Sequence, residues 1–91
     1  MITYQVLSLD VWGGEEEGTF EKNDFYNAGE IEVNGEANES EILSKMIEEG
    51  FLASHCTLES VAIHDYNAMG EYYEVKDAKS GYPLYDLQQK R

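Results

Sequence analysis

The amino-acid sequence predicts an α+β fold, in which one helix packs on one face of a small antiparallel or mixed sheet of about five strands. Several short segments alternate apolar and polar residues, as half-buried strands do. Only residues 39–49 have the apolar periodicity of an amphipathic helix. The predicted element order is therefore β-β-α-β-β-β, and a single helix can cover only one face of such a sheet.

The chain of 91 residues is expected to form one acidic α+β domain, with a frayed tail at residues 87–91. Its hydrophobic content of 42% is sufficient for the core of a small domain. No apolar run reaches about 18 residues, so we expect no membrane-spanning segment. The first residues lack a basic region, which argues against a signal peptide. A single cysteine cannot form an internal disulfide, which is typical of a cytoplasmic protein.

The first strand is predicted from Ile2 to Trp12. Its apolar residues alternate on one face up to Val6 and on the other face from Leu7 onward. This change of phase predicts a β-bulge near Val6 and Leu7, or a central strand buried on both faces. Residues 20–27 follow without a regular period. A half-exposed strand with acidic outer residues is then predicted over residues 29–34.

The helix is predicted from Glu39 to about Glu49. Asn38 is the predicted N-cap, and Gly50 suits the left-handed position that ends a helix in a Schellman motif. Glu41 and Lys45 have the i,i+4 spacing of a favourable ion pair. The buried stripe is formed by Ile42, Leu43, Met46 and Ile47.

Three further strands are predicted over residues 57–66, 72–76 and 82–87. Turn-forming residues separate them at positions 67–70 and 78–81. Pro83 cannot donate a ladder hydrogen bond, so the last strand is expected at an edge of the sheet. An exposed edge strand also leaves a homodimer open as an alternative to a monomer.

The charge is concentrated in the first half of the chain. The net charge is −13; residues 1–49 hold 13 acidic residues against two lysines, and residues 50–91 hold six against four basic residues. Such a chain repels nucleic acid and anionic membranes, and a basic protein surface is the partner that complements it. Solubility and adaptation to high salt are the alternative explanations of the acidity.

Two groups of residues are predicted to bind a partner. The acidic surface is predicted to comprise Glu15, Glu16, Glu17, Glu21, Asp24, Glu30, Glu32, Glu36, Glu39 and Glu41. Aromatic residues among these acids are candidate interface anchors, because aromatic hot spots carry binding energy while charges steer association. They are Trp12, Phe20, Phe25 and Tyr26; the alternative is that these rings belong to the hydrophobic core.

No pattern in the sequence predicts an enzyme. His55, Cys56 and His64 lack the paired spacing of a zinc site. Ser54 lies next to His55, but adjacent residues of an extended chain point to opposite faces. We therefore predict no catalytic residue, no metal and no cofactor.

Several short motifs resemble those of small uncharacterised proteins of bacteriophages and mobile elements. They are Asp10-Val11-Trp12-Gly13, Asn23-Asp24, Tyr73-Glu74-Val75-Lys76-Asp77 and Gly81-x-Pro83-Leu84-Tyr85-x-Leu87. In size and acidity the chain is also similar to phage inhibitors of bacterial defence, including anti-CRISPR and antirestriction proteins that imitate nucleic acid.

This resemblance implies a non-enzymatic inhibitor in the cytoplasm of a host bacterium. Its carboxylates would occupy the nucleic-acid groove of a basic host protein, such as a CRISPR or restriction effector, without binding nucleic acid directly. The alternative is an accessory interaction module that uses aromatic and β-edge contacts, with the acids serving only solubility.

Overall fold

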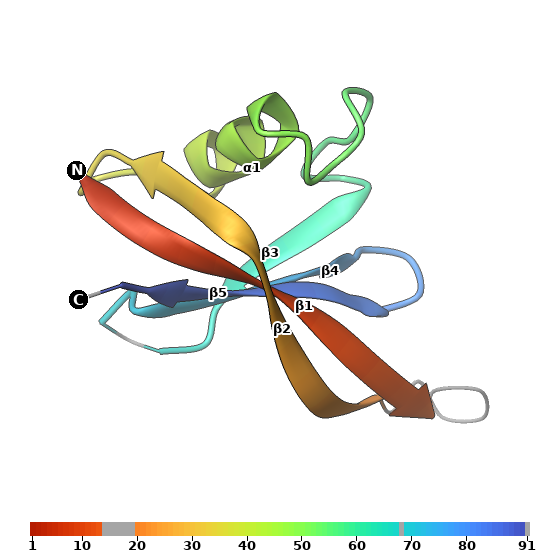
Figure 1. Ribbon diagram of the computed structural model, residues 1–91. Helices are drawn as coiled ribbons and strands as arrows, with labels where there is room; N and C mark the ends of the chain where they lie inside the picture. The colour runs from red at the N-terminus through yellow and green to blue at the C-terminus, as the bar shows by residue number, and fades with distance from the viewer. Residues whose placement is uncertain (14–19, 68, 91) are drawn as a thin grey trace.

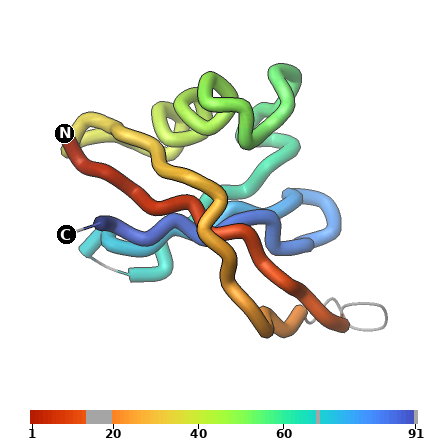
Figure 2. The backbone as a smooth tube through the Cα atoms, in the orientation of Figure 1, coloured from red at the N-terminus to blue at the C-terminus, as the bar shows by residue number. Residues whose placement is uncertain are grey.

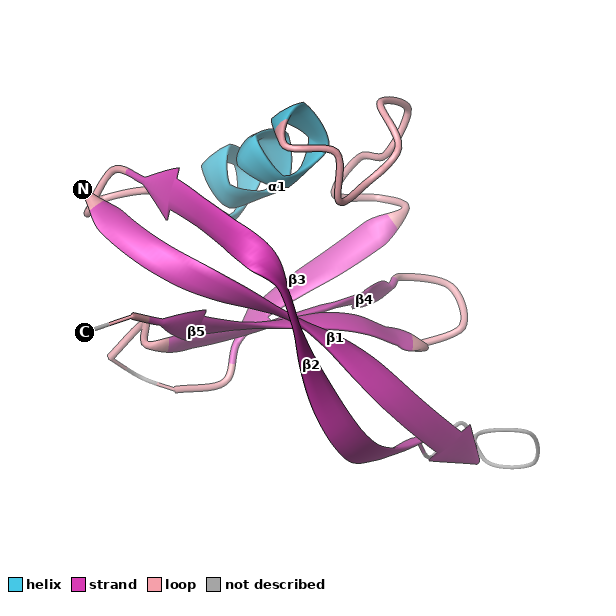
Figure 3. Ribbon diagram, viewed as in Figure 1, coloured by secondary structure: helices cyan, strands magenta, loops and turns pink. Residues whose placement is uncertain are grey.

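In the part of the chain that the structure describes, five strands form one antiparallel sheet and one helix lies on one face of it (Figures 1 and 3). The computed structural model describes residues 1–13, 20–67 and 69–90. The elements are β1 (Ile2–Gly13), β2 (Phe20–Val33), α1 (Glu39–Glu48), β3 (Val61–Asp65), β4 (Tyr72–Asp77) and β5 (Pro83–Gln89). The strand order is β2-β1-β5-β4-β3, with every neighbouring pair antiparallel. The predicted α+β class and element order are confirmed.

The hydrophobic core lies between α1 and the sheet face that it covers. Strand residues of this face alternate with residues of the opposite face, which we call the open face. The fully buried centre includes Val6, Val75 and Leu87 from three adjacent strands and Met46 from α1. The remaining core residues are Tyr4, Ile31, Val33, Ile42, Leu43, Val61 and Ile63.

The ends of α1 are fixed by its own sequence. The Asn38 side chain accepts a hydrogen bond from the Glu41 backbone N–H at 2.9 Å, which confirms the predicted N-cap. Gly50 has φ +87°, and the Phe51 N–H donates to the Met46 carbonyl at 2.9 Å. These features confirm the predicted Schellman motif.

The predicted pair between Glu41 and Lys45 was wrong. Lys45 instead contacts Glu48 at 3.5 Å and Glu49 at 3.4 Å. Lys45 thereby neutralises part of the negative charge at the C-terminal end of the helix, where acids are unfavourable.

The predicted irregularity near Val6 and Leu7 is confirmed, and β1 is an interior strand between β2 and β5. Val6 pairs with Gly29 and Leu7 with Asn27, so Ala28 of β2 is the extra residue. Gly29 has φ +147°, and a Cβ atom there would lie 2.9 Å from the Phe51 ring. Glycine is therefore required both by the backbone and by the packing.

The predicted start of the second strand was wrong, because β2 begins at Phe20 and not at residue 29. A second register shift lies between Asp10 and Val11, where Asn23 is the extra residue. Each bulge moves the following side chains to the other face. Two bulges in one strand explain why residues 20–27 have no regular period.

The third strand is shorter than predicted, because it begins at Val61 and ends at Asp65. Residues 57–60 form a turn in which the Ser60 hydroxyl accepts from the Thr57 N–H at 2.8 Å. A hydroxyl that bonds the local backbone in this way competes with strand pairing.

The predicted edge position of the last strand was wrong, and residues 87–89 of the predicted frayed tail belong to the strand. β5 lies between β1 and β4, runs to Gln89, and buries Leu87 completely. Pro83 is the first residue of β5 and lies at a register shift opposite Lys76. A proline is tolerated inside a sheet at such a position, because no ladder hydrogen bond is required of it.

Candidate binding surfaces

The β1–β2 hairpin extends beyond the rest of the sheet (Figures 1 and 2). β1 pairs with β5 only from Tyr4 to Ser8, so its later residues are paired with β2 alone. We call residues 9–13 and 20–26 the arm. Its β2 side bends toward the open face, because the Phe20 ring makes a T-shaped contact with Tyr82 at 5.4 Å between centroids.

The predicted acidic surface is exposed wherever the structure describes it. The exposed members are Glu21, Asp24, Glu30, Glu32, Glu36, Glu39 and Glu41, whereas Glu15, Glu16 and Glu17 lie outside the described residues. Glu32 and Glu41 line one hollow of about 260 Å³ between β2 and α1, together with Glu48. Glu30 pairs with Lys90 at 2.5 Å. The structure thus brings acids of the strand and of the helix together, while Glu21 and Asp24 lie apart on the arm.

Two of the four predicted aromatic anchors lie on one face of the arm among carboxylates. Trp12 is 63% exposed and Tyr26 is 56% exposed. Trp12 lies opposite Glu21, and Asp10 lies opposite Asp24. We call these five residues the arm patch.

The arm patch combines aromatic surface with negative charge. The Trp12 indole N–H donates to Asp10 at 3.3 Å. The negative charge of Asp24, with smaller contributions from burial and Asp10, raises the pKa of Tyr26. Two aspartates that face each other across a strand pair repel, which costs stability. A cationic partner would relieve that repulsion. Asp10 was not predicted as a binding residue from the sequence. Its spacing of two residues from Trp12 could have indicated that both side chains lie on the same face of the strand.

The other two predicted anchors lie on the opposite side of the arm. Phe20 is partly buried against Tyr82, and Phe25 lines a cavity of the open face together with Leu7. The four aromatic residues therefore do not form one surface.

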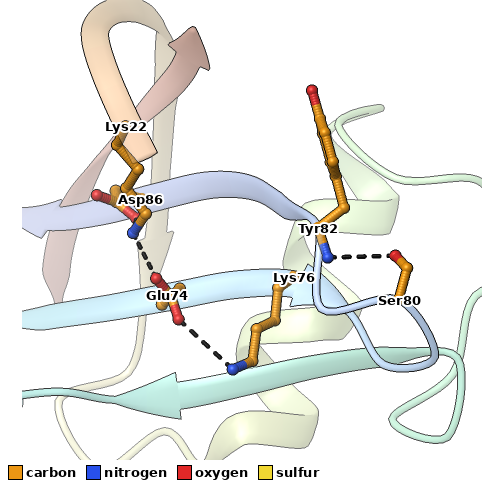
Figure 4. Close-up of polar contacts among 6 residues, drawn as sticks. All are labelled: Lys22, Glu74, Lys76, Ser80, Tyr82 and Asp86. Atoms are coloured by element: carbon orange, nitrogen blue, oxygen red, sulfur yellow. Dashed lines mark hydrogen bonds and ion pairs between the residues drawn. The ribbon is translucent and has the colours of Figure 1, made fainter. Parts of the chain in front are cut away.

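An ion-pair network connects the arm to the open face of the sheet. Lys22 of β2 donates to Asp86 of β5 at 2.8 Å. It also donates to Glu74 of β4, as Figure 4 shows. Lys76 lies 3.7 Å from the other oxygen of Glu74. Asp86 is only 6% exposed and is the one buried charged residue in the described part of the chain.

The network perturbs the protonation of its members. Burial acts to lower the pKa of Lys22, but the hydrogen bonds with Asp86 and Glu74 outweigh it and raise that pKa. Burial acts to raise the pKa of Glu74, but Lys22 and Lys76 outweigh it and lower that pKa. The network was not predicted from the sequence, although Lys22 is one of only two lysines in the acidic half of the chain.

The stabilisation from the network is expected to fail at both ends of the pH scale. Because the folded pKa of Glu74 is lowered, its contribution is complete above the ordinary value of 4.5 and is lost as pH falls through the folded value. The pKa of Lys22 is raised, so its contribution is complete below pH 10.5 and is lost as pH rises through the higher folded value.

Urea unfolding at several pH values measures this pH dependence of the free energy of unfolding. A Glu74→Gln variant should lose less stability than the wild type on acidification, and an equal loss would contradict the assignment.

The described residues contain no group of three or more His, Cys, Asp or Glu side chains arranged to bind a metal. No helix in the described part of the chain has both the length and the apolar composition that a membrane crossing requires. Comparison with protein-family models, curated proteins and solved structures found no match to the chain.

Proposed function

We propose that the protein is a non-enzymatic inhibitor that binds a basic nucleic-acid-binding protein of a bacterial host. Its acidic surface and the arm patch would occupy the groove that normally holds phosphates. The observation that carries the proposal is the arm patch, where Trp12 and Tyr26 are exposed among Asp10, Glu21 and Asp24. Lysine and arginine arrays that neutralise phosphates accept carboxylates in the same way.

Further support comes from the distribution of acids along β2, an edge strand of the sheet. Acidic residues occur near both ends of β2, from Glu21 to Glu32, a distance of roughly 35 Å for an extended chain. The hollow next to Glu32 adds Glu41 and Glu48 of α1. Negative charge distributed along an edge strand in this way accelerates association with a basic surface and makes it sensitive to salt.

A second candidate function is an interaction module that uses aromatic and β-edge contacts. The free edges of the sheet are β2 and β3, and Tyr82 is 43% exposed. Tyr85 does not belong to such a surface, since its hydroxyl donates to the Phe51 carbonyl at 3.2 Å and its ring packs on Phe51. This candidate predicts that Tyr82→Ala disrupts binding and that the acids are dispensable.

Capture of partners from bacterial lysate tests the proposal. We expect the wild-type protein to retain a basic nucleic-acid-binding protein at about 50 mM salt, to release it at about 300 mM, and to lose it to competing DNA. A partner that survives the high-salt wash and ignores DNA would contradict the proposal and favour the second candidate.

Matched variants connect the captured partner to the arm patch. Glu21→Gln/Asp24→Asn is expected to weaken binding about fivefold to tenfold, since each exposed charge pair contributes about 0.2–1 kcal/mol. Trp12→Ala is expected to weaken it about 30-fold, as the loss of an aromatic hot spot does. Glu49→Gln/Glu59→Gln removes the same charge from exposed residues outside the proposed surface and serves as the control. If the two double variants weakened binding equally, net charge alone would determine binding, and the arm patch would not be a defined binding site.

A further inference from the structure

The open face contains a cavity of about 450 Å³ whose walls are mainly aromatic and aliphatic. It is lined by Leu7, Phe25, Tyr66, Tyr72, Asp86 and Gln88. Phe25 is 51% exposed and Tyr66 is 52% exposed, so both rings present apolar surface to solvent around the cavity. The buried carboxylate of Asp86 lies among these rings. The combination of aromatic walls with one carboxylate is the chemistry that recognises an organic cation.

The chain already places one of its own cations against these walls. The Lys22 ammonium lies 5.7 Å from the centroid of the Tyr66 ring and donates to Oδ1 of Asp86 at 2.8 Å. A cation within about 6 Å of an aromatic face is attracted by the ring quadrupole. Tyr72 also lines the cavity, and its ring lies 5.8 Å from that of Tyr66 at a tilt of 32°.

Two carboxylates act on the part of the cavity next to Tyr66. Burial, followed by the negative charges of Asp86 and Glu74, raises the pKa of Tyr66 to about 12. Asp86 and Glu74 thus place negative charge near the Tyr66 hydroxyl, beside the Lys22 ammonium. A second cation entering there would meet carboxylate charge and aromatic faces together.

We propose that this cavity binds the guanidinium of an arginine side chain from the protein partner. The inference rests on the proposed function and names the group that the partner inserts. Arginine fits better than lysine, because a planar and weakly hydrated guanidinium stacks on aromatic faces. Its plane packs against the rings of Tyr66 and Tyr72, close to the Asp86 carboxylate that also lines the cavity. The Gln88 side chain, which donates to the Tyr72 hydroxyl at 3.3 Å, holds that ring in place.

A pair of isosteric peptides tests the proposal on the full chain. The probes are acetyl-Gly-Arg-Gly-amide and the same peptide with citrulline, which has nearly the shape of arginine without the charge. Titration of the isotope-labelled protein is followed by NMR. We expect the arginine peptide to shift the signals of Phe25, Tyr66, Tyr72 and Gln88, and the citrulline peptide to bind about tenfold more weakly. Equal affinity for the two peptides, or no binding by either at millimolar concentration, would overturn the proposal.

Variants separate the cavity from the acidic surface. Tyr72→Leu and Phe25→Leu keep apolar side chains and are expected to weaken arginine binding about fivefold to tenfold. Tyr82→Leu removes an aromatic ring outside the cavity and is the matched control, and the NMR spectrum reports whether each variant is folded. If all three variants weaken binding equally, the cavity is not the site.

The failure of this proposal is distinguishable from that of the proposed function. If the arginine peptide shifts the arm patch and leaves the cavity unchanged, the cavity proposal fails while the acidic-surface function stands. If the peptide binds the cavity but Glu21→Gln/Asp24→Asn leaves partner capture from lysate unchanged, the cavity stands and the proposed function fails.

Discussion

Replacing Lys22 with methionine is expected to lower the free energy of unfolding by about 3 kcal/mol. The substitution removes the cation that pairs with Asp86 and Glu74, and Asp86 is left buried with an uncompensated charge. Removing one member of a buried pair costs about 3–5 kcal/mol. The lower end of this range applies here, because the Lys22 and Glu74 side chains are not fully buried and remain 22% and 24% exposed. Urea unfolding followed by circular dichroism measures the loss.

Two further variants determine whether the loss arises from the buried charge. Lys45→Met removes ion pairs at the surface of α1 and is expected to cost no more than about 1 kcal/mol. Lys22→Met/Asp86→Leu replaces the pair with apolar side chains and is expected to recover most of the stability. If Lys22→Met were no more destabilising than Lys45→Met, the network would not hold the arm to the sheet.

The network also matters for the proposed binding surfaces. Lys22 lies on the arm, and its contacts with β4 and β5 fix how the arm lies against the open face. A fixed arm presents the arm patch in one orientation, so binding a partner does not carry the entropic cost of ordering it. The loss of Lys22 would therefore weaken partner binding as well as stability.

The helix was predicted closely from the sequence because its signals are local. Asn38, Gly50 and the apolar stripe act within a few residues of one another, and each feature recurs in the structure. The first strand was predicted for a similar reason, since its change of phase at Val6 already indicated the register shift.

The extent of β2 and the ion-pair network depend on contacts that no local pattern records. Two bulges conceal the period of residues 20–27, and the pairing with β1 determines that they form a strand. Lys22 and Asp86 are 64 positions apart, so their contact follows from the strand order. The exposure of the acids was predicted more easily, because charged side chains stay in water unless they are paired.

The place of β5 is where the sequence was most misleading. Pro83 is typical of an edge strand, and the polar residues after Leu87 suggest a tail. The structure places β5 at the centre of the sheet, where Leu87 contributes to the fully buried core. The apolar pattern of β5 was therefore a better guide than its single proline.

Leu87→Ala is accordingly expected to lower the free energy of unfolding by about 3–4 kcal/mol, at least as much as Lys22→Met. Its side chain is 0% exposed in an interior strand, so truncation removes buried apolar surface and leaves a cavity that β1 and β4 cannot close. Leu58→Ala makes the same truncation at a side chain that is 43% exposed, and should cost less than about 1 kcal/mol. Urea unfolding of both variants measures the difference. Similar small losses in the two variants would mean that Leu87 belongs to a peripheral tail and not to the core. The ion pair between its neighbour Asp86 and the arm would then not be buried.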